Sequence, residues 1–313
     1  MTLISTAPAT APVTEAGRRR RPVTYWAYLV PIGIGFGAIV LVPFAMNLYY
    51  SFFDWKGGAA PRTWVGLDNY RELLRDDVFW SSFGNTLYLI VAIAVVPTLI
   101  GLLLAALLFD YLGRLFGPRV ASVLRASYYL PQILPIAVAG VVWAWILETR
   151  DGALNSTLRA LGIAGGPDWL GDPDIALRSV MIMLIWLQIG YPVVIFMSAL
   201  QRVEPELHEA AELDGAGWWR RFRAITVPHI RTDIYVVVLT ATIGAMKLFA
   251  PILILTKGGP ESSTYVPSYF SYRNFFELSR VGYGAASATT LAIVIGLVAA
   301  GLIFWQARSM EER

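Results

Sequence analysis

The stretch EAAELDGA, residues 209–216, lies between two long apolar segments and is followed by the basic run RRFR at residues 220–223. It is predicted to end a short polar helix, because Pro205 suits the first helical position and Gly215 suits the left-handed position that follows a helix. A polar helix held between two membrane spans is placed to contact a soluble partner. The stretch therefore predicts a membrane protein with a loop that works outside the bilayer.

The composition of the whole chain agrees with this prediction. Of its 313 residues, 56% are hydrophobic and 15% are charged, whereas an average soluble domain carries about 25% charged residues. The net charge is +3, but the basic residues are dispersed among loops, so nucleic acid is not expected as a partner. Cysteine is absent and the histidines are His208 and His229, which excludes disulfides and argues against a metal site.

A helix needs about 20 apolar residues to cross the hydrocarbon core of a bilayer. Six segments of the chain meet this length, and one of them contains a charge, at Lys247. The segments are residues 26–49, 86–109, 126–147, 179–201, 234–256 and 285–306. The sequence therefore predicts an all-α membrane protein with six transmembrane helices.

An even number of spans places both termini on the same side of the membrane. That side carries 14 Lys and Arg residues, including the run at 18–21, and the other side carries 10. Because positive charge accumulates on the cytoplasmic side, both termini and the loop 202–232 are predicted to be cytoplasmic. Residues 1–22 are expected to form a disordered cytoplasmic tail, and residues 23–313 to form one transmembrane domain.

The pattern from Glu209 to Pro228, E-A-A-x-x-D-G-A-x5-F-x-x-I-x-x-P, resembles the signature loop of the permease subunits of binding-protein-dependent ABC importers. Val227 and Thr232 stand where that family usually has leucine and proline. Other segments resemble the sugar-importer branch, and the GGP motif after the fifth span resembles the maltose-transporter-type first permease of a heterodimeric pair. These segments are WVGLDNY at 64–70, YLP at 129–131, LTKGGP at 255–260 and YGAASA at 283–288.

The resemblance implies a type I ABC importer permease in the cytoplasmic (inner) membrane that catalyses no reaction itself. Its implied partners are a second homologous permease, an ATPase dimer, an extracytoplasmic substrate-binding protein, a carbohydrate substrate and membrane lipid. The chain has no GxxxxGK[ST] phosphate loop, so it needs no cofactor of its own, and ATP and Mg²⁺ are expected on the ATPase. In this family the loop is a coupling helix that docks into a cleft of the ATPase. The residues implied to make that contact are Glu209, Ala210, Ala211, Asp214, Gly215 and Ala216.

Five residues are candidates for the substrate site. Lys247 lies within a predicted span, where a lysine is costly unless it is paired or hydrated, so it is either a substrate ligand or part of a structural ion pair. On the same segment, Gly244 and Leu248 belong to a row of mostly small residues at helical spacing. Such a row either packs against another helix or leaves room for a ligand. In maltose-type permeases the fourth and fifth helices line the sugar site. On the fourth, Gln188 and Tyr191 share a face and offer hydrogen bonds and an aromatic ring to a sugar, or hydrogen bonds between helices.

We therefore expect carbohydrate import by alternating access, driven by a separate ATPase. The alternative within the family is an importer of a glycerol phosphate ester or polyol, for which Lys247 would be a natural anion partner. An ion-coupled secondary transporter is a more distant alternative, because it predicts acidic residues within spans and inverted repeats. Here the acidic residues lie in loops or at the ends of spans, and no repeat is visible.

Overall fold

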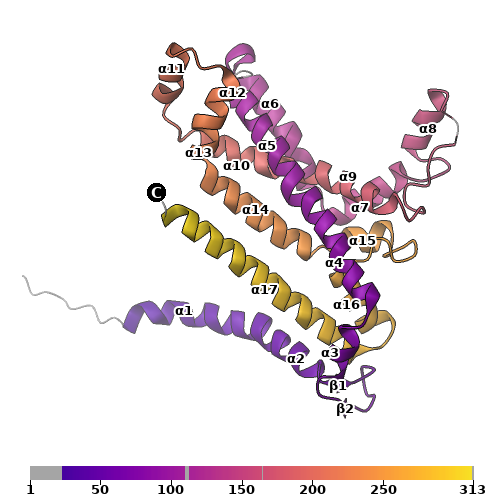
Figure 1. Ribbon diagram of the computed structural model, residues 1–313. Helices are drawn as coiled ribbons and strands as arrows, with labels where there is room; N and C mark the ends of the chain where they lie inside the picture. Colours follow the sequence, from indigo (N-terminus) through magenta and orange to yellow (C-terminus); the bar gives the residue numbers. More distant parts are fainter. Residues whose placement is uncertain (1–22, 110–112, 164, 312–313) are drawn as a thin grey trace, which may run out of the picture. The chain divides into compact units, whose positions relative to one another are not determined.

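The computed structural model describes residues 23–109, 113–163 and 165–311 (Figure 1). The tail expected at residues 1–22 lies outside this part of the chain. The chain divides into two compact units, residues 1–46 and residues 47–313. The first contains α1 and the beginning of α2, and the second contains all later elements, so each is treated separately.

The described residues are almost entirely helical, which confirms the predicted fold class. The α-helices are α1 (Val23–Phe36), α2 (Val42–Tyr50), α3 (Asp68–Leu73), α4 (Asp77–Ile90), α5 (Val96–Leu107), α6 (Gly113–Ile133), α7 (Ile136–Ile146), α8 (Ala153–Ala160), α9 (Ala176–Gln188), α10 (Gly190–Leu200), α11 (Pro205–Leu213), α12 (Trp218–Arg221), α13 (Val227–His229), α14 (Arg231–Met246), α15 (Ala250–Leu255), α16 (Pro267–Tyr272) and α17 (Val281–Glu311). Wider π-helical turns are η1 (Gly37–Leu41), η2 (Val91–Val95), η4 (Phe222–Thr226) and η5 (Arg273–Glu277). Two short strands, β1 (Phe53–Asp54) and β2 (Thr63–Trp64), form one antiparallel pair in the first outer loop.

Among the described residues, four continuous helical stretches are long and apolar enough to cross a membrane: Tyr28–Tyr50, Asp77–Leu107, Ala176–Leu200 and Val281–Arg308. A fifth candidate is the pair Ser122–Ile133 and Ile136–Ile146, which is bent by 93°. The third predicted span, residues 126–147, is therefore broken into two helices. Pro135 explains the bend, because proline lacks a backbone N–H and disfavours a helical conformation in the residue before it.

The fifth predicted segment, residues 234–256, is also broken. It consists of α14 and α15, which are separated by residues 247–249. The chain leaves the helical conformation at Phe249 (φ −138°), and Pro251 lies in the first turn of α15. Proline is tolerated there because the first N–H groups of a helix have no intrahelical acceptor. Lys247 therefore lies at a helix end and not in the middle of a continuous span.

The π-helical turns η1, η2 and η4 each end two residues before a proline, namely Pro43, Pro97 and Pro228. A proline in a regular helix collides with the carbonyl four residues earlier and leaves it without a donor. A turn that is one residue wider moves this carbonyl away from the proline ring. The helices thus continue through these prolines with a local widening.

Two hydrophobic clusters form the core of the unit 47–313. The first joins α4, α9, α15 and α16 near the outer loops, and its fully buried members include Phe79, Met183 and Ile252. The second joins α5, α10, η4 and α14 near the loop 202–232, and includes Phe196 and Val237. In the second cluster α5 and α10 approach closely, since a Cβ atom on Gly101 would lie 2.6 Å from the Cβ atom of Pro192. Burial of these side chains holds the ends of the helices around the site in fixed positions.

Candidate functional site: a coupling loop and a central pocket

The loop between α10 and α14 carries the polar helix that the sequence predicts. Helix α11 begins after Glu204, has Pro205 in its first turn and ends at Leu213. Gly215 follows with φ +74°, a conformation that glycine adopts without strain. The N–H of Gly215 donates to the carbonyl of Glu212 (3.0 Å) and the N–H of Ala216 donates to that of Ala211 (2.9 Å). This pair of bonds is a Schellman motif, which satisfies the carbonyls at the end of the helix.

Three contacts hold the coupling loop, residues 202–232, together and attach it to the neighbouring helices. At its base, Arg202 donates to both carboxylate oxygens of Asp233 (2.7 and 2.8 Å), which joins the end of α10 to the start of α14. Within the loop, Arg221 pairs with Glu212 at 2.5 Å and connects α12 to α11. Phe222 is 5% exposed and inserts into the second hydrophobic cluster. These contacts connect α11 to α12, and the loop to α10 and α14.

The residues predicted to contact the ATPase lie on the solvent-exposed side of the coupling loop. Glu209, Ala210, Asp214 and Gly215 are exposed, Ala211 and Ala216 are half-buried, and no residue of α11 is fully buried. Figure 1 shows α11 at the end of the unit opposite to β1 and β2. A notch of about 250 Å³ between α11 and α12 is lined by Ala211, Asp214, Ala216, Arg220, Arg221, Ala224 and Ile225.

One feature of this helix was not identified from the sequence. Leu213 is 90% exposed, although the neighbouring core of the loop is apolar. The signal was the apolar residue between Glu212 and Asp214, which is far more exposed than Leu207, the other leucine of this helix (38%). A leucine at this position would give α11 an apolar side chain to insert into a groove of a partner, as in helix-in-groove docking.

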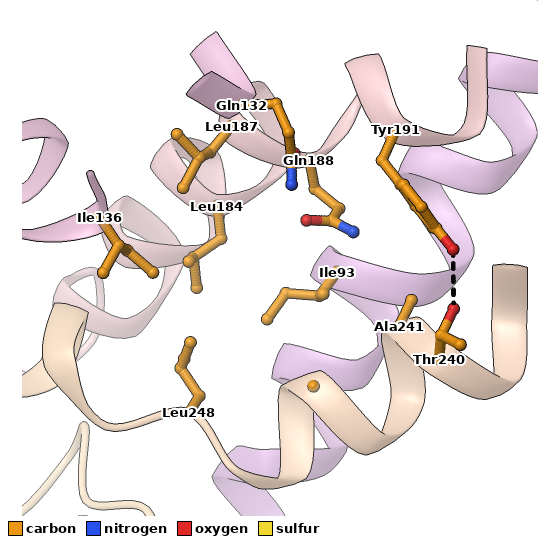
Figure 2. Close-up of a pocket in the computed structure, with 11 residues that line it drawn as sticks. Ile93, Gln132, Ile136, Leu184, Leu187, Gln188, Tyr191, Thr240, Ala241 and Leu248 are labelled. Atoms are coloured by element: carbon orange, nitrogen blue, oxygen red, sulfur yellow. Dashed lines mark hydrogen bonds between the residues drawn. The ribbon is translucent and has the colours of Figure 1, made fainter. Parts of the chain in front are cut away.

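A central pocket of about 300 Å³ lies between η2, α6, α7, α9, α10 and α14 (Figure 2). Its lining residues are Ile93, Gln132, Ile136, Leu184, Leu187, Gln188, Tyr191, Thr240, Ala241, Gly244 and Leu248. Four of the five predicted substrate residues, Gln188, Tyr191, Gly244 and Leu248, are thus brought to one cavity. Their role in binding stays a prediction.

The polar groups of the central pocket are few and converge on its open space. The Tyr191 hydroxyl lies 3.2 Å from Thr240 Oγ1, as Figure 2 shows, and this contact links α10 to α14. Gln132 Oε1 is buried and has no hydrogen-bond partner among the described residues. An unpaired buried oxygen costs about 1–3 kcal/mol, so water or a ligand hydroxyl is expected to bind it. Gln132 and Thr240 were not predicted, because they come from segments that are distant in the sequence.

Lys247 lies outside the lining of this pocket. It is exposed and follows the last residue of α14, where its N–H donates to the carbonyls of Ile243 and Gly244. Its side chain forms no ion pair with any residue that the structure describes. The structural alternative, a contact of Lys247 with another subunit, and its role as a substrate ligand both stay predictions.

Comparison with known proteins assigns the chain to a family. The sequence profile of the binding-protein-dependent transport system inner membrane component matches residues 98–312. The chain belongs to this family. The permease is therefore a multi-pass protein of the inner membrane and the membrane-embedded part of a transport system, which confirms the resemblance seen in the sequence.

Two relatives and one solved structure are similar to the permease over most of its length. It is 32% identical to the diacetylchitobiose uptake system permease protein NgcF of Streptomyces coelicolor, over 94% of this chain and 86% of NgcF. It is 30% identical to the lactose transport system permease protein LacF of Rhizobium radiobacter, over 95% of this chain and 97% of LacF. A chain of a bacterial ABC transporter involved in alginate import superposes with a TM-score of 0.79 at 22% identity, covering 91% of this chain and 96% of that chain. This last similarity establishes the type I permease fold.

Proposed function

We propose that the permease imports a carbohydrate, and that the central pocket holds it during passage through the membrane. The lining of the pocket carries the proposal. It combines two amides, a hydroxyl pair and a tyrosine ring with apolar walls, and none of its eleven lining residues is charged. Amides and hydroxyls donate to and accept from sugar hydroxyls, and the apolar walls fit the faces of sugar rings. NgcF and LacF, the permease proteins of a diacetylchitobiose uptake system and a lactose transport system, support the same substrate class.

A glycerol phosphate ester fits this pocket less well. A phosphate needs a cation or several N–H donors around it, and the lining of the central pocket supplies no cation. Lys247 would have to reach the ligand from outside the lining. A neutral, hydroxyl-rich substrate is therefore the better match to the residues that face the cavity.

We propose further that α11 is the coupling helix. Its exposed residues 209–215 and the notch beside it would dock on a separate ATPase subunit, which would bind ATP and Mg²⁺. The contacts of Arg202 with Asp233 and of Arg221 with Glu212 would pass the movement to α10 and α14. Both helices line the central pocket, so a displacement of α11 would change the opening of the cavity. A second homologous permease and an extracytoplasmic binding protein would complete the transporter.

The test is to purify the tagged chain in mild detergent together with its associated proteins. Recovery of an ATPase and a second permease, with ATPase activity stimulated by lactose, diacetylchitobiose or maltotriose and the cognate binding protein, is expected. Stimulation by glycerol phosphates and not by these sugars would replace the carbohydrate assignment. Recovery of the chain without an ATPase would contradict the role proposed for α11.

A further inference from the structure

A second polar cavity, the outer pocket, lies near the outer ends of α4 and α9. It has a volume of about 460 Å³, which is larger than the central pocket. Its walls come from α4, the start of α9 and the loop after α15, and they are formed by Asn85, Tyr88, Pro173, Asp174, Leu177, Arg178, Met181 and Ser263. This cavity shares no lining residue with the central pocket, and the account of coupling and transport given above does not use it.

The polar groups of the outer pocket are available to a ligand. Arg178 uses Nε (3.0 Å) and Nη2 (2.6 Å) to bond the backbone carbonyl of Asp174, and no carboxylate of the described residues pairs with it. Asn85 donates to the carbonyl of Tyr265 at 2.9 Å, which leaves its own side-chain oxygen as an acceptor. Ser263 Oγ is buried and has no partner among the described residues. Such an oxygen requires a water molecule or a ligand group.

The charges in this pocket balance. Arg178 supplies one guanidinium and Asp174 one carboxylate, and the other polar lining groups are an amide, a phenol and a hydroxyl. With Nε and one Nη2 hydrogen engaged by the Asp174 carbonyl, Arg178 keeps its remaining Nη hydrogens as donors. A carboxylate accepts two hydrogen bonds, so these groups suit neighbouring hydroxyls of one sugar ring. Tyr88 is 61% exposed and adds a ring face. This set favours a neutral polyhydroxylated ligand over an anion or a cation.

Helix α9 connects the outer pocket to the central pocket. Leu177 and Met181 line the outer pocket, and Leu184 and Gln188 line the central one. The spacing of four, three and four residues places all four on one face of the helix. Met181 and Gln188 are seven residues apart, which corresponds to about 10 Å along the helix axis.

Helix α4 and its continuation η2 make the same connection. Asn85 and Tyr88 line the outer pocket, and Ile93 lines the central one. In a regular helix the residue seven positions after Asn85, at position 92, would lie on the same face as Asn85. The π-helical turn Val91–Val95 contains one extra residue, so Ile93 lies closer to that face instead. The two pockets therefore follow one another along two neighbouring helices.

We infer that the outer pocket is an outer subsite for carbohydrate, through which a sugar chain passes between the extracytoplasmic side and the central pocket. This inference rests on the proposed function. An oligosaccharide in the central pocket would extend along α9 into the outer pocket. There Arg178 and Asp174 bind the hydroxyls of one ring and Ser263 Oγ gains the partner it lacks.

The absence of cysteine from the chain allows a direct test. Single variants Leu177→Cys in the outer pocket and Gly244→Cys in the central pocket are made in the full chain and purified with its transporter partners. A Cβ atom at Gly244 meets no atom within 4 Å, so this change is sterically open. Leu154→Cys is the control, because Leu154 is another half-buried leucine of the same outer loop but does not line either pocket. The rate of thiol labelling is measured with and without a saturating mixture of lactose, diacetylchitobiose and maltotriose.

The sugars are expected to slow labelling of Leu177→Cys and Gly244→Cys several-fold and to leave Leu154→Cys unchanged. Adding Arg178→Gln should abolish protection at Leu177→Cys and retain it at Gly244→Cys, whereas Arg150→Gln in the same outer loop should change neither. Protection at Gly244→Cys alone in the Arg178-containing protein would overturn the outer subsite and leave the proposed function intact. Protection at neither position, with no import of these sugars by cells, would overturn both.

Discussion

The Arg221 guanidinium lies 2.5 Å from the Glu212 carboxylate, Nη1 to Oε2, and this ion pair joins the two halves of the coupling loop. Arg221 is 16% exposed in its side chain and Glu212 is 63% exposed. An ion pair with one open partner contributes at most about 1 kcal/mol to stability. Its main effect is therefore to fix the orientation of α11 on α12, and not to hold the fold together.

The first prediction follows from this pair. Arg221→Met should reduce substrate-stimulated ATPase activity several-fold while the amount of chain in the membrane stays unchanged, because α11 loses its link to α12. Arg223→Met is the matched control, since Arg223 is exposed in the same basic run and no ion pair holds it in the described structure. Equal loss of activity in both variants would show that net charge matters and not the pair.

The second prediction concerns Gly215. Gly215→Asp should distort the end of α11, because an L-residue at φ +74° costs about 1–2 kcal/mol. Transport should fall while the membrane helices stay folded, as measured by uptake and by thermal unfolding of the purified chain. Gly217→Asp should be tolerated, because Gly217 has φ −62° before α12, a position that aspartate favours. Neither glycine has another atom within 4 Å of an added Cβ, so steric collision within the chain does not separate the two variants.

The third prediction concerns Leu213, which is 90% exposed. Leu213→Ser should weaken association with the ATPase roughly tenfold or more, since burial of a leucine contributes about 1.5–3 kcal/mol. Leu161→Ser removes a leucine that is 72% exposed on the outer side and should leave this association unchanged. Quantitative pull-down of the ATPase on the tagged chain measures both. An unaffected affinity in Leu213→Ser would remove this residue from the docking surface.

The fourth prediction concerns the volume of the central pocket. Gly244→Leu should place a branched side chain in the cavity and reduce sugar uptake to near background, with normal recovery of the complex. Gly84→Leu is the control, because a Cβ at Gly84 also meets no atom within 4 Å and Gly84 does not line this pocket. Undiminished uptake by Gly244→Leu would place the sugar path elsewhere.

The sequence was informative where local chemistry determines structure. Pro205 and Gly215 gave the limits of α11 correctly, because the first turn and the residue after a helix have strong residue preferences. The apolar segments gave the fold class for a similar reason, since the length of a span is fixed by the bilayer. The sequence did not show which of the prolines in the spans would break a helix. The helix continues through Pro97 with a π-helical turn before it, whereas Pro135 lies at a 93° bend.

The candidate site was only partly accessible from the sequence. Gln188 and Tyr191 were chosen as neighbours on one helix, and they do line the central pocket. Gln132 and Thr240 were missed, because their approach to Tyr191 depends on the packing of α6 and α14 around α10. The sequence did not show that the helix ends at Met246, which places Lys247 directly after the last residue of α14.

Uptake of sugar by right-side-out membrane vesicles tests the central claim most directly. Vesicles that contain the transporter are loaded with ATP and Mg²⁺, supplied with the cognate binding protein and given radiolabelled lactose, diacetylchitobiose or maltotriose. The account predicts that at least one sugar accumulates, that accumulation requires ATP inside, that it persists when ion gradients are collapsed, and that it is lost in Gly215→Asp. Accumulation that follows an imposed ion gradient without ATP would contradict it.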